Sequence, residues 1–363
     1  MNVFDRKAKT VQKQRSMLNA DHTVFDYLKE EVGWRVADRI YDIKRNFTAA
    51  LDLGCGKGYV GRNVVRETIG MLQQCDLSSH FLDVSLKSDD VPTCSVVVDE
   101  EYLPYRDCTF DIVLSSLRQV IWILLVPLFF YLHWINDLPG TFKQVHRILV
   151  NDGCFMGSMF GGDTLHELRV SLYLAELERK GGFSPHISPY TSAQDLGSLL
   201  QRAGFNMLTI DVDDMTVTYP SMVDLMWDLK GMAENNCSWS RSLNLNVDTI
   251  LAASAIYQEK YGFTKVENES EVKCIPAQFQ IINFIAWKPD KSQLQAAKRG
   301  SGEVSMKDLA KLDELMKQIE NLRKEEGAEL PKMQKNIDEL QKTALKVKNI
   351  ADKSEGDGNS KHK

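Results

Sequence analysis

Three alternating glycines directly after a short apolar segment are the feature that most constrains the fold of this chain. Residues 49–53 read as a buried strand, and Gly54, Gly56 and Gly58 follow it at once. Glycine adopts positive φ and lets another backbone come close, so this stretch predicts a tight turn at the end of a strand. We expect a helix over 59–67 next, with its free N–H groups and positive dipole end at the turn. Together these predict a cradle for a nucleotide-like ligand.

The spacing of the glycines narrows the kind of nucleotide site. No Gly-Lys-Ser/Thr closes the loop, and the third glycine comes one residue earlier than in the dinucleotide-binding motif. The pattern D-x-G-x-G-x-G over 52–58 resembles the first motif of Rossmann-like S-adenosylmethionine (SAM) methyltransferases. That resemblance implies a loop that wraps the methionine part of SAM through Gly54, Cys55, Gly56 and Gly58, with Asp52 near its ammonium. The alternative is a glycine-rich turn without a ligand.

Acidic residues follow the next two predicted strands. Residues 71–77 read as a strand that ends at Asp76-Leu77, about twenty residues past the loop, where a carboxylate can accept hydrogen bonds from both ribose hydroxyls. Alternatively, Asp76 is a surface residue that merely ends its strand. Residues 95–98 form the third strand, and Asp99-Glu100 follows where SAM methyltransferases place an acid near the adenine amino group. Residues 110–114 form the fourth strand, and Ser115 at its end completes the predicted cofactor site.

The remaining pattern continues the alternation of strands and helices, which predicts a helix-covered, mostly parallel sheet. The fold class is therefore α/β: a Rossmann-like class I SAM methyltransferase fold with a seven-stranded sheet, helical insertions and a C-terminal helical tail. We expect a fifth strand at 154–160, and an antiparallel edge from strands at 206–218 and 277–287. Helices are expected at 138–149, 165–180, 191–203, 221–230 and 247–261. Asp163 or Thr164 should cap the second of these, and Gly204 should end the third.

Composition excludes several classes of protein. The 363 residues leave room for one large or two ordinary domains, and a net charge of −6 with a pI near 5.7 argues against nucleic acid as a partner. The seven cysteines are scattered, odd in number and without C-x-x-C, which favours reduced thiols and neither a zinc site nor a disulfide framework.

Three segments are predicted. Residues 1–46 form a basic, helical lid segment: the first twenty residues carry five basic side chains and one acid, Asp5, and an amphipathic helix over 25–41 follows that could lid the cofactor cleft. The basic stretch reads as a solvated helix, or alternatively as a matrix transit peptide that lacks the usual arginine and serine richness. Residues 47–290 form the methyltransferase-like domain. Residues 291–363 form a charged tail of two short helices interrupted by Pro331, with a disordered end; it is a solvated appendage or a partner-binding helix.

An apolar run over 120–132, most of it within an insertion at 118–131, interrupts this pattern. Thirteen residues are too few to span a bilayer, which needs about twenty. Three interpretations remain: a buried extension or hairpin, a membrane-docking loop, or an artefact of the gene prediction.

Further blocks of sequence resemble the mitochondrial complex I assembly factor 5 family over roughly residues 2–305. They lie at 2–6, 25–33, 37–39, 51–58, 132–139, 159–165 and 182–189. The resemblance implies a mitochondrial protein on the matrix side of the inner membrane, with SAM held by Asp52, Gly54, Gly56, Asp76 and Asp99. It also implies that the protein hydroxylates an arginine of an iron–sulfur subunit of NADH dehydrogenase and works with other assembly factors. The insertion at 118–131 and the tail from about residue 306 depart from the family pattern.

The residues themselves suggest candidates for chemistry near the cleft. His133, Asp163 and His186 are candidate catalytic residues. Trp134, Asp137, Glu167 and Tyr190 could hold a cationic substrate through carboxylates and aromatic faces. No histidine is followed two residues later by an acid, so the sequence predicts no iron site and hydroxylation follows from the resemblance alone. Two alternatives stay open: a SAM-dependent methyltransferase acting on a protein or acyl carrier, and a non-catalytic SAM-binding chaperone.

Overall fold

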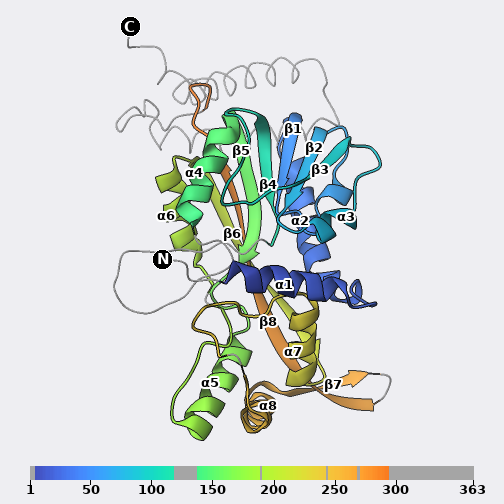
Figure 1. Ribbon diagram of the computed structural model, residues 1–363, viewed down its shortest axis with the longest axis vertical. Coiled ribbons are helices and arrows are strands. Elements are labelled where there is room, and N and C mark those ends of the chain that lie inside the picture. The colour runs from blue at the N-terminus through green and yellow to red at the C-terminus, as the bar shows by residue number, and fades with distance from the viewer. Residues whose placement is uncertain (1–4, 118–136, 189, 243, 268–269, 294–363) are drawn as a thin grey trace, which may run out of the picture. The chain divides into compact units, whose positions relative to one another are not determined.

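In the computed structural model (Figure 1), the strand before the glycine loop lies inside the sheet. This strand, β1 (Phe47–Leu53), pairs in parallel with β2 (Ile69–Asp76) on one side and with β4 (Phe110–Ser115) on the other. The structure describes residues 5–117, 137–188, 190–242, 244–267 and 270–293. The insertion at 118–131 and the predicted tail helices therefore lie outside the described residues. The chain divides into two compact units, Met1–Ser292 and Gln293–Lys363.

The sheet has the order β3-β2-β1-β4-β5-β8-β6, and β7 pairs only with β8. The further strands are β3 (Thr93–Val97), β5 (Leu149–Phe160), β6 (Asn206–Tyr219), β7 (Phe263–Glu267) and β8 (Ser270–Trp287). The four pairings from β3 to β5 are parallel, whereas β8 is antiparallel to both β5 and β6. All seven predicted strands are confirmed. The hairpin of β7 and the first part of β8 was not predicted.

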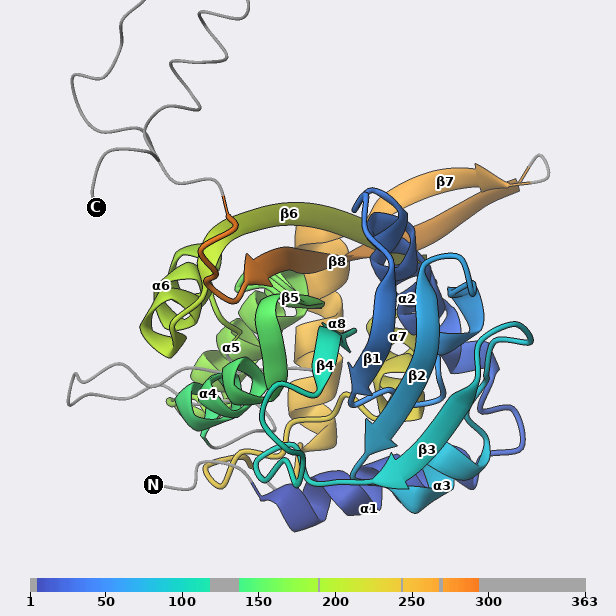
Figure 2. The same ribbon diagram turned by 90° about the horizontal axis from the view of Figure 1, so that it is seen from above.

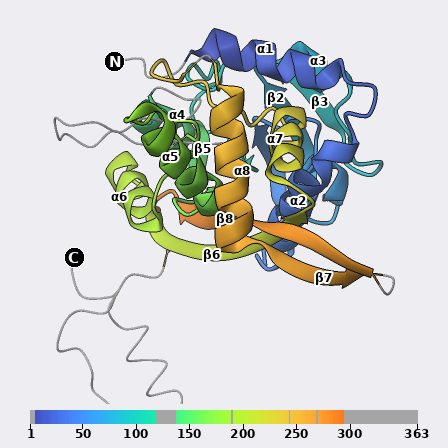
Figure 3. The ribbon, with the colours of Figure 1, turned by 90° about the horizontal axis from the view of Figure 1, so that it is seen from below.

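Helices cover both faces of the sheet, as Figure 2 shows. They are α1 (Arg6–Met17), α2 (Tyr27–Tyr41), α3 (Ser79–Asp83), α4 (Leu138–Ile148), α5 (His166–Lys180), α6 (Ala193–Ala203), α7 (Met222–Gly231) and α8 (Val247–Tyr261). Successive side chains of a strand point to opposite faces, so Ala50 and Ile112 join the core under α2, whereas Leu51 and Val113 join the core under α4 and α6. Helix α8 lies between α5 and α7 (Figure 3).

The chain reverses its direction of sheet growth between β1 and β4, because β2 and β3 are added on one side and β5 on the other. In open α/β sheets the crevice at the carboxyl ends of the strands on either side of such a switch point is where ligands bind. The predicted cofactor loop leaves β1 at this point. Among the described residues, no helix is both long enough and apolar enough to cross a membrane.

Two predicted helix features are wrong. The helix expected over 59–67 is only a single 3₁₀ turn, η2 (Gly61–Asn63), after which Val64 is extended at φ −89° and ψ 148°. Glycine is a poor helix residue, and Val64 is buried beneath the sheet instead of continuing a helical turn. Helix α5 takes neither Asp163 nor Thr164 as its cap. It begins after Leu165, which has φ +55° and no side-chain cap, because Thr164 is buried and its hydroxyl bonds the backbone of Gln280 instead.

Candidate functional site

The glycine loop has the backbone that the sequence predicts. Gly54, Gly56 and Gly58 have φ values of +73°, +57° and +81°, a region that side chains disfavour. The amides of Gly54 and Cys55 both donate to the carbonyl of Cys75, at 2.8 and 2.9 Å, which fixes the loop against the end of β2. A Cβ atom at Gly58 would lie 2.2 Å from the carbonyl oxygen of Leu86, so this turn leaves no room for a side chain.

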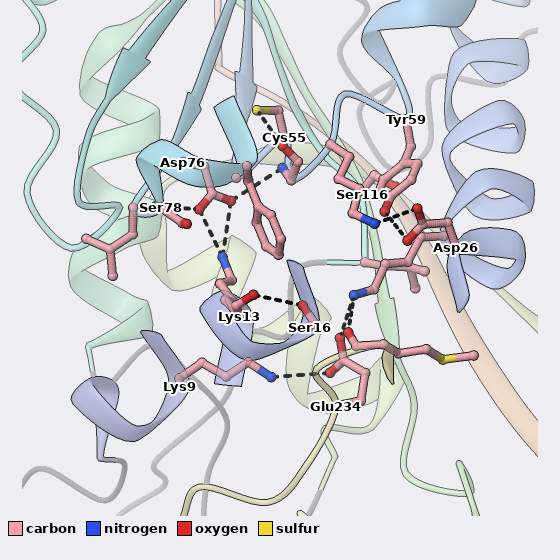
Figure 4. Close-up of a pocket in the computed structure, with 18 of the residues that line it drawn as sticks. Lys9, Lys13, Ser16, Asp26, Cys55, Tyr59, Asp76, Ser78, Ser116 and Glu234 are labelled. Atoms are coloured by element: carbon pink, nitrogen blue, oxygen red, sulfur yellow. Dashed lines mark hydrogen bonds and ion pairs between the residues drawn. The ribbon is translucent and has the colours of Figure 1, made fainter. Parts of the chain in front are cut away.

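Asp76 lies at the end of β2 with its carboxylate buried and held by the backbone. One oxygen accepts a hydrogen bond from the amide of Ser78 at 2.8 Å, and the other accepts one from the amide of Gly56 at 3.3 Å. Figure 4 shows this carboxylate facing the cavity beside the glycine loop. An acid at this point of the fold can accept the hydroxyl hydrogens of a ribose.

Helix α1 lies across the same end of the sheet and brings basic side chains to the acids of the site. Lys13 Nζ lies 3.0 and 3.1 Å from the two carboxylate oxygens of Asp76. Arg6 makes a two-pronged ion pair with Asp99, at 2.7 and 2.9 Å, and also contacts Glu101 at 3.0 Å. The expectation of a solvated basic helix is thus wrong: positions spaced three to four residues apart share one face of α1, and this face is docked on the acids.

A cavity of about 90 Å³ lies between the glycine loop and α1, and we call it the cofactor cavity. Gly54, Cys55, Gly56, Asp76 and Leu77 are predicted cofactor residues that line it. The remaining five, Asp52, Gly58, Asp99, Glu100 and Ser115, are not part of the lining; the neighbouring Ser116 and Leu117 are. Asp52 and Glu100 are fully buried. Asp99 does not line the cavity itself but contacts Arg6, which does.

Three buried residues that interact with one another, Asp26, Lys57 and Tyr59, line part of the cofactor cavity. Asp26 accepts hydrogen bonds from Lys57 Nζ and from the Tyr59 hydroxyl, each at 2.7 Å. Burial lowers the pKa of Lys57 even though Asp26 favours its charged form, and burial together with Asp26 raises the pKa of Tyr59 far above its ordinary value. None of these three residues was predicted from the sequence. Helix α2 itself packs into the core through its apolar face, and among its residues Lys29 reaches the cavity lining.

A second cavity, of about 240 Å³, lies between α5, α7 and the loops that follow them. Its lining includes the predicted residues His186 and Tyr190, together with apolar side chains such as Leu168, Leu172 and Leu229. Glu234, which was not predicted, belongs to the lining of both cavities. The linings of the two cavities therefore share this residue.

His186 is held by an acid. Its Nε2 lies 2.9 Å from Oε1 of Glu176 and 3.2 Å from the hydroxyl of Ser184. Burial opposes ionisation of Glu176, but hydrogen bonds from His186, the Ser184 amide and Lys180 outweigh it and lower the pKa of Glu176 to about 2. A carboxylate partner of this kind fixes the orientation of an imidazole.

Three other predicted substrate and catalytic residues, Asp137, Asp163 and Glu167, lie outside both linings. Asp137 caps α4 by accepting a hydrogen bond from the Gly140 amide at 2.9 Å. Asp163 contacts Gln280 Nε2 at 3.4 Å, and Glu167 is buried against the Gln278 amide. His133 and Trp134 lie outside the described residues.

The parallel sheet, the glycine loop and the carboxylate after β2 define a class, the proteins with the Rossmann-like SAM methyltransferase fold. A family profile described as "Methyltransferase domain" matches residues 51–157. Over 316 residues the chain is 52% identical to the mitochondrial arginine-hydroxylase NDUFAF5 of Mus musculus, covering 87% of this chain and 86% of that protein. The Homo sapiens protein of the same name is 51% identical over 316 residues, with the same coverage. This chain belongs to the NDUFAF5 arginine-hydroxylase family, as its sequence blocks indicate.

A more distant relative is named for a different activity. The malonyl-[acyl-carrier protein] O-methyltransferase of Gallionella capsiferriformans is 29% identical over 301 residues, covering 80% of this chain and 93% of that protein.

Proposed function

We propose that this chain binds SAM in the cofactor cavity. The observation that carries the proposal is Asp76, a buried carboxylate that the backbone holds at the end of the strand after a side-chain-free glycine loop. Asp76 would accept the ribose hydroxyls, and the loop Gly54–Gly58 would wrap the methionine part. Lys13 and Arg6 form ion pairs with Asp76 and Asp99. These two side chains of α1 must therefore move aside when the nucleoside binds. When bound, SAM supplies a sulfonium and an activated methyl group at this edge of the sheet.

We propose further that the protein hydroxylates an arginine of an iron–sulfur subunit of respiratory complex I, on the matrix side of the mitochondrial inner membrane and together with other assembly factors. Relatives at 51–52% identity are named mitochondrial arginine-hydroxylase, which supports the reaction and the compartment. Replacing a hydrogen by a hydroxyl removes two electrons from the arginine, so a two-electron oxidant must enter as a co-substrate. The protein's part is to bind the guanidinium, align it and exclude water.

Mass spectrometry of complex I subunits tests this reading. Cells that express the chain should carry a +16 Da arginine in an iron–sulfur subunit, and cells that lack it should not. A +14 Da shift would support the alternative, a SAM-dependent methyltransferase, which the 29% identical malonyl-[acyl-carrier protein] O-methyltransferase favours. Normal complex I assembly with the Asp76→Asn variant, in the absence of SAM binding, would instead support a non-catalytic chaperone. Fractionation of mitochondria tests the matrix location and the peripheral association with the inner membrane.

A further inference from the structure

The linings of the two cavities share one acidic residue, Glu234. Glu234 lies just after the end of α7, and its amide bonds the carbonyl of Leu229 at 2.8 Å. The preceding residue, Ala233, has φ +61°, which is rare for a residue with a Cβ atom. This local strain turns the chain so that the Glu234 side chain points inward, where only 9% of it is exposed. Figure 4 shows it facing α1 across the cofactor cavity.

Two lysines surround Glu234, but they bind its two oxygens unequally. Lys29 lies 3.1 Å from Oε1, whereas Lys9 lies 3.6 Å from Oε2, which is longer than a hydrogen bond. Among the described residues, the buried Oε2 atom accepts no hydrogen bond. Burial works against ionisation of Glu234, but the two lysines outweigh it and lower the pKa of this carboxyl, which is therefore charged at neutral pH. A buried anionic oxygen thus lacks a hydrogen-bond donor, and it belongs to a residue that lines both cavities.

The lining of the second cavity suits a long cationic side chain, because its one arginine, Arg241, is paired with Asp5 at 3.3 Å. Leucines from α5 and α7 form apolar walls, which suit the methylene stem of such a side chain. The aromatic ring of Tyr190 and the imidazole of His186 lie along the same lining. Asn236 joins the two loops: its Nδ2 donates to the carbonyl of Pro185 at 2.8 Å, and its Oδ1 accepts from Ser188 at 3.2 Å. The loop with His186 and the loop with Glu234 are therefore fixed to one another.

We infer that the second cavity takes the arginine side chain of the substrate and that Glu234 binds the guanidinium of this arginine. Before the substrate binds, Lys9 is the cation that neighbours Oε2 of Glu234. This assignment rests on the proposed arginine substrate. The planar fork of a guanidinium donates two parallel hydrogen bonds to a carboxylate, which the ammonium of Lys9 at 3.6 Å does not.

Lys9 suits the role of a displaceable cation. Its side chain is buried and donates to the carbonyl of Ala233. Burial lowers the pKa of Lys9 to about 7, against the pull of Glu234, so its charged form is held weakly. It also lies on the same face of α1 as Arg6 and Lys13, whose acids belong to the cofactor site. Movement of α1 would therefore release the nucleoside site and the guanidinium site together.

The test measures binding of N-acetyl-arginine methylamide to the full chain saturated with SAM, with the citrulline analogue as a neutral probe of the same shape. Calorimetry or ligand-observed NMR should show that wild type prefers the arginine probe. Glu234→Gln should weaken arginine binding about tenfold or more, whereas Glu178→Gln, at an exposed position of α5, should not. Lys9→Met should strengthen arginine binding several-fold. This variant tests the assignment with Glu234 unchanged, and so serves if Glu234→Gln fails to fold.

The assignment is overturned if the wild type binds neither probe or binds both equally, if folded Glu234→Gln binds arginine as well as wild type does, or if Lys9→Met binds arginine no more tightly than wild type. The +16 Da measurement in cells separates this failure from failure of the proposed function. An arginine hydroxylated equally by wild type and Glu234→Gln would remove Glu234 from the site and leave the function standing. No +16 Da arginine with wild type would overturn the function itself.

Discussion

Lys13 Nζ lies within 3.1 Å of both carboxylate oxygens of Asp76, although 63 residues separate the two in the chain. This ion pair places a protein cation at the carboxylate that we propose accepts the ribose hydroxyls. The carboxylate of Asp76 thus binds both the glycine loop, through the Gly56 amide, and the covering helix α1, through Lys13.

Lys13→Met should raise the affinity for SAM by about fivefold, because the ribose hydroxyls no longer compete with an ion pair for Asp76. Calorimetry of wild type and variant measures this. Lys7→Met, an exposed lysine of the same helix, serves as the matched control and should leave the affinity unchanged. Weaker binding with Lys13→Met would mean that Lys13 belongs to the site that holds SAM.

Asp76→Asn should lower the affinity for SAM by about thirtyfold, because an amide cannot accept a hydrogen bond from both ribose hydroxyls and keep its bonds to the loop amides. Asp83→Asn, at the exposed end of α3, is the control of equal charge change. Binding that survives Asp76→Asn in a folded protein, as judged by circular dichroism, would move the nucleoside site elsewhere.

Gly58→Ala should cost far more stability than Gly181→Ala, although both glycines have positive φ. At Gly181 a Cβ atom meets nothing within 4 Å, so only the backbone conformation is penalised, by about 1 kcal/mol. At Gly58 the Cβ atom would lie 2.2 Å from the Leu86 carbonyl oxygen, and we expect about 3 kcal/mol or more. Urea denaturation measures both, and equal losses would contradict the close backbone approach.

Glu176→Gln should lower the free energy of unfolding by about 2 kcal/mol at pH 7, because charge-assisted hydrogen bonds to His186 and Lys180 are lost. The folded-state pKa of Glu176 is lowered to about 2 from an ordinary value of 4.5. Its charge therefore stabilises the fold fully above pH 4.5, and this contribution is lost as the pH falls from 4.5 toward 2.

Denaturant unfolding at several pH values should accordingly show wild type and Glu176→Gln converging below pH 4.5. Glu178 lies two residues further along α5 and has an exposed side chain. The stability of Glu178→Gln should therefore equal that of wild type at every pH. A difference between wild type and Glu176→Gln that stays constant down to pH 3 would contradict the low pKa.

The sequence by itself determined the strands and the cofactor loop. Strand periodicity and glycine spacing are local properties, so β1, the positive-φ turn and Asp76 could be placed from residues within about twenty-five positions of each other. The helix over 59–67 failed because tertiary burial of Val64 outweighed local helix signals.

Only the tertiary structure decided what α1 does. Arg6, Lys9 and Lys13 look solvated in sequence. Their partners, however, are acids 63 to 93 residues away on β2 and after β3, and Glu234, which follows α7. Glu234 carries no motif, and His186 gains its meaning from Glu176 and from the cavity that both loops enclose. Ion pairs and cavities depend on positions in space that no local pattern encodes, because burial, and not sequence spacing, decides which charges must be paired.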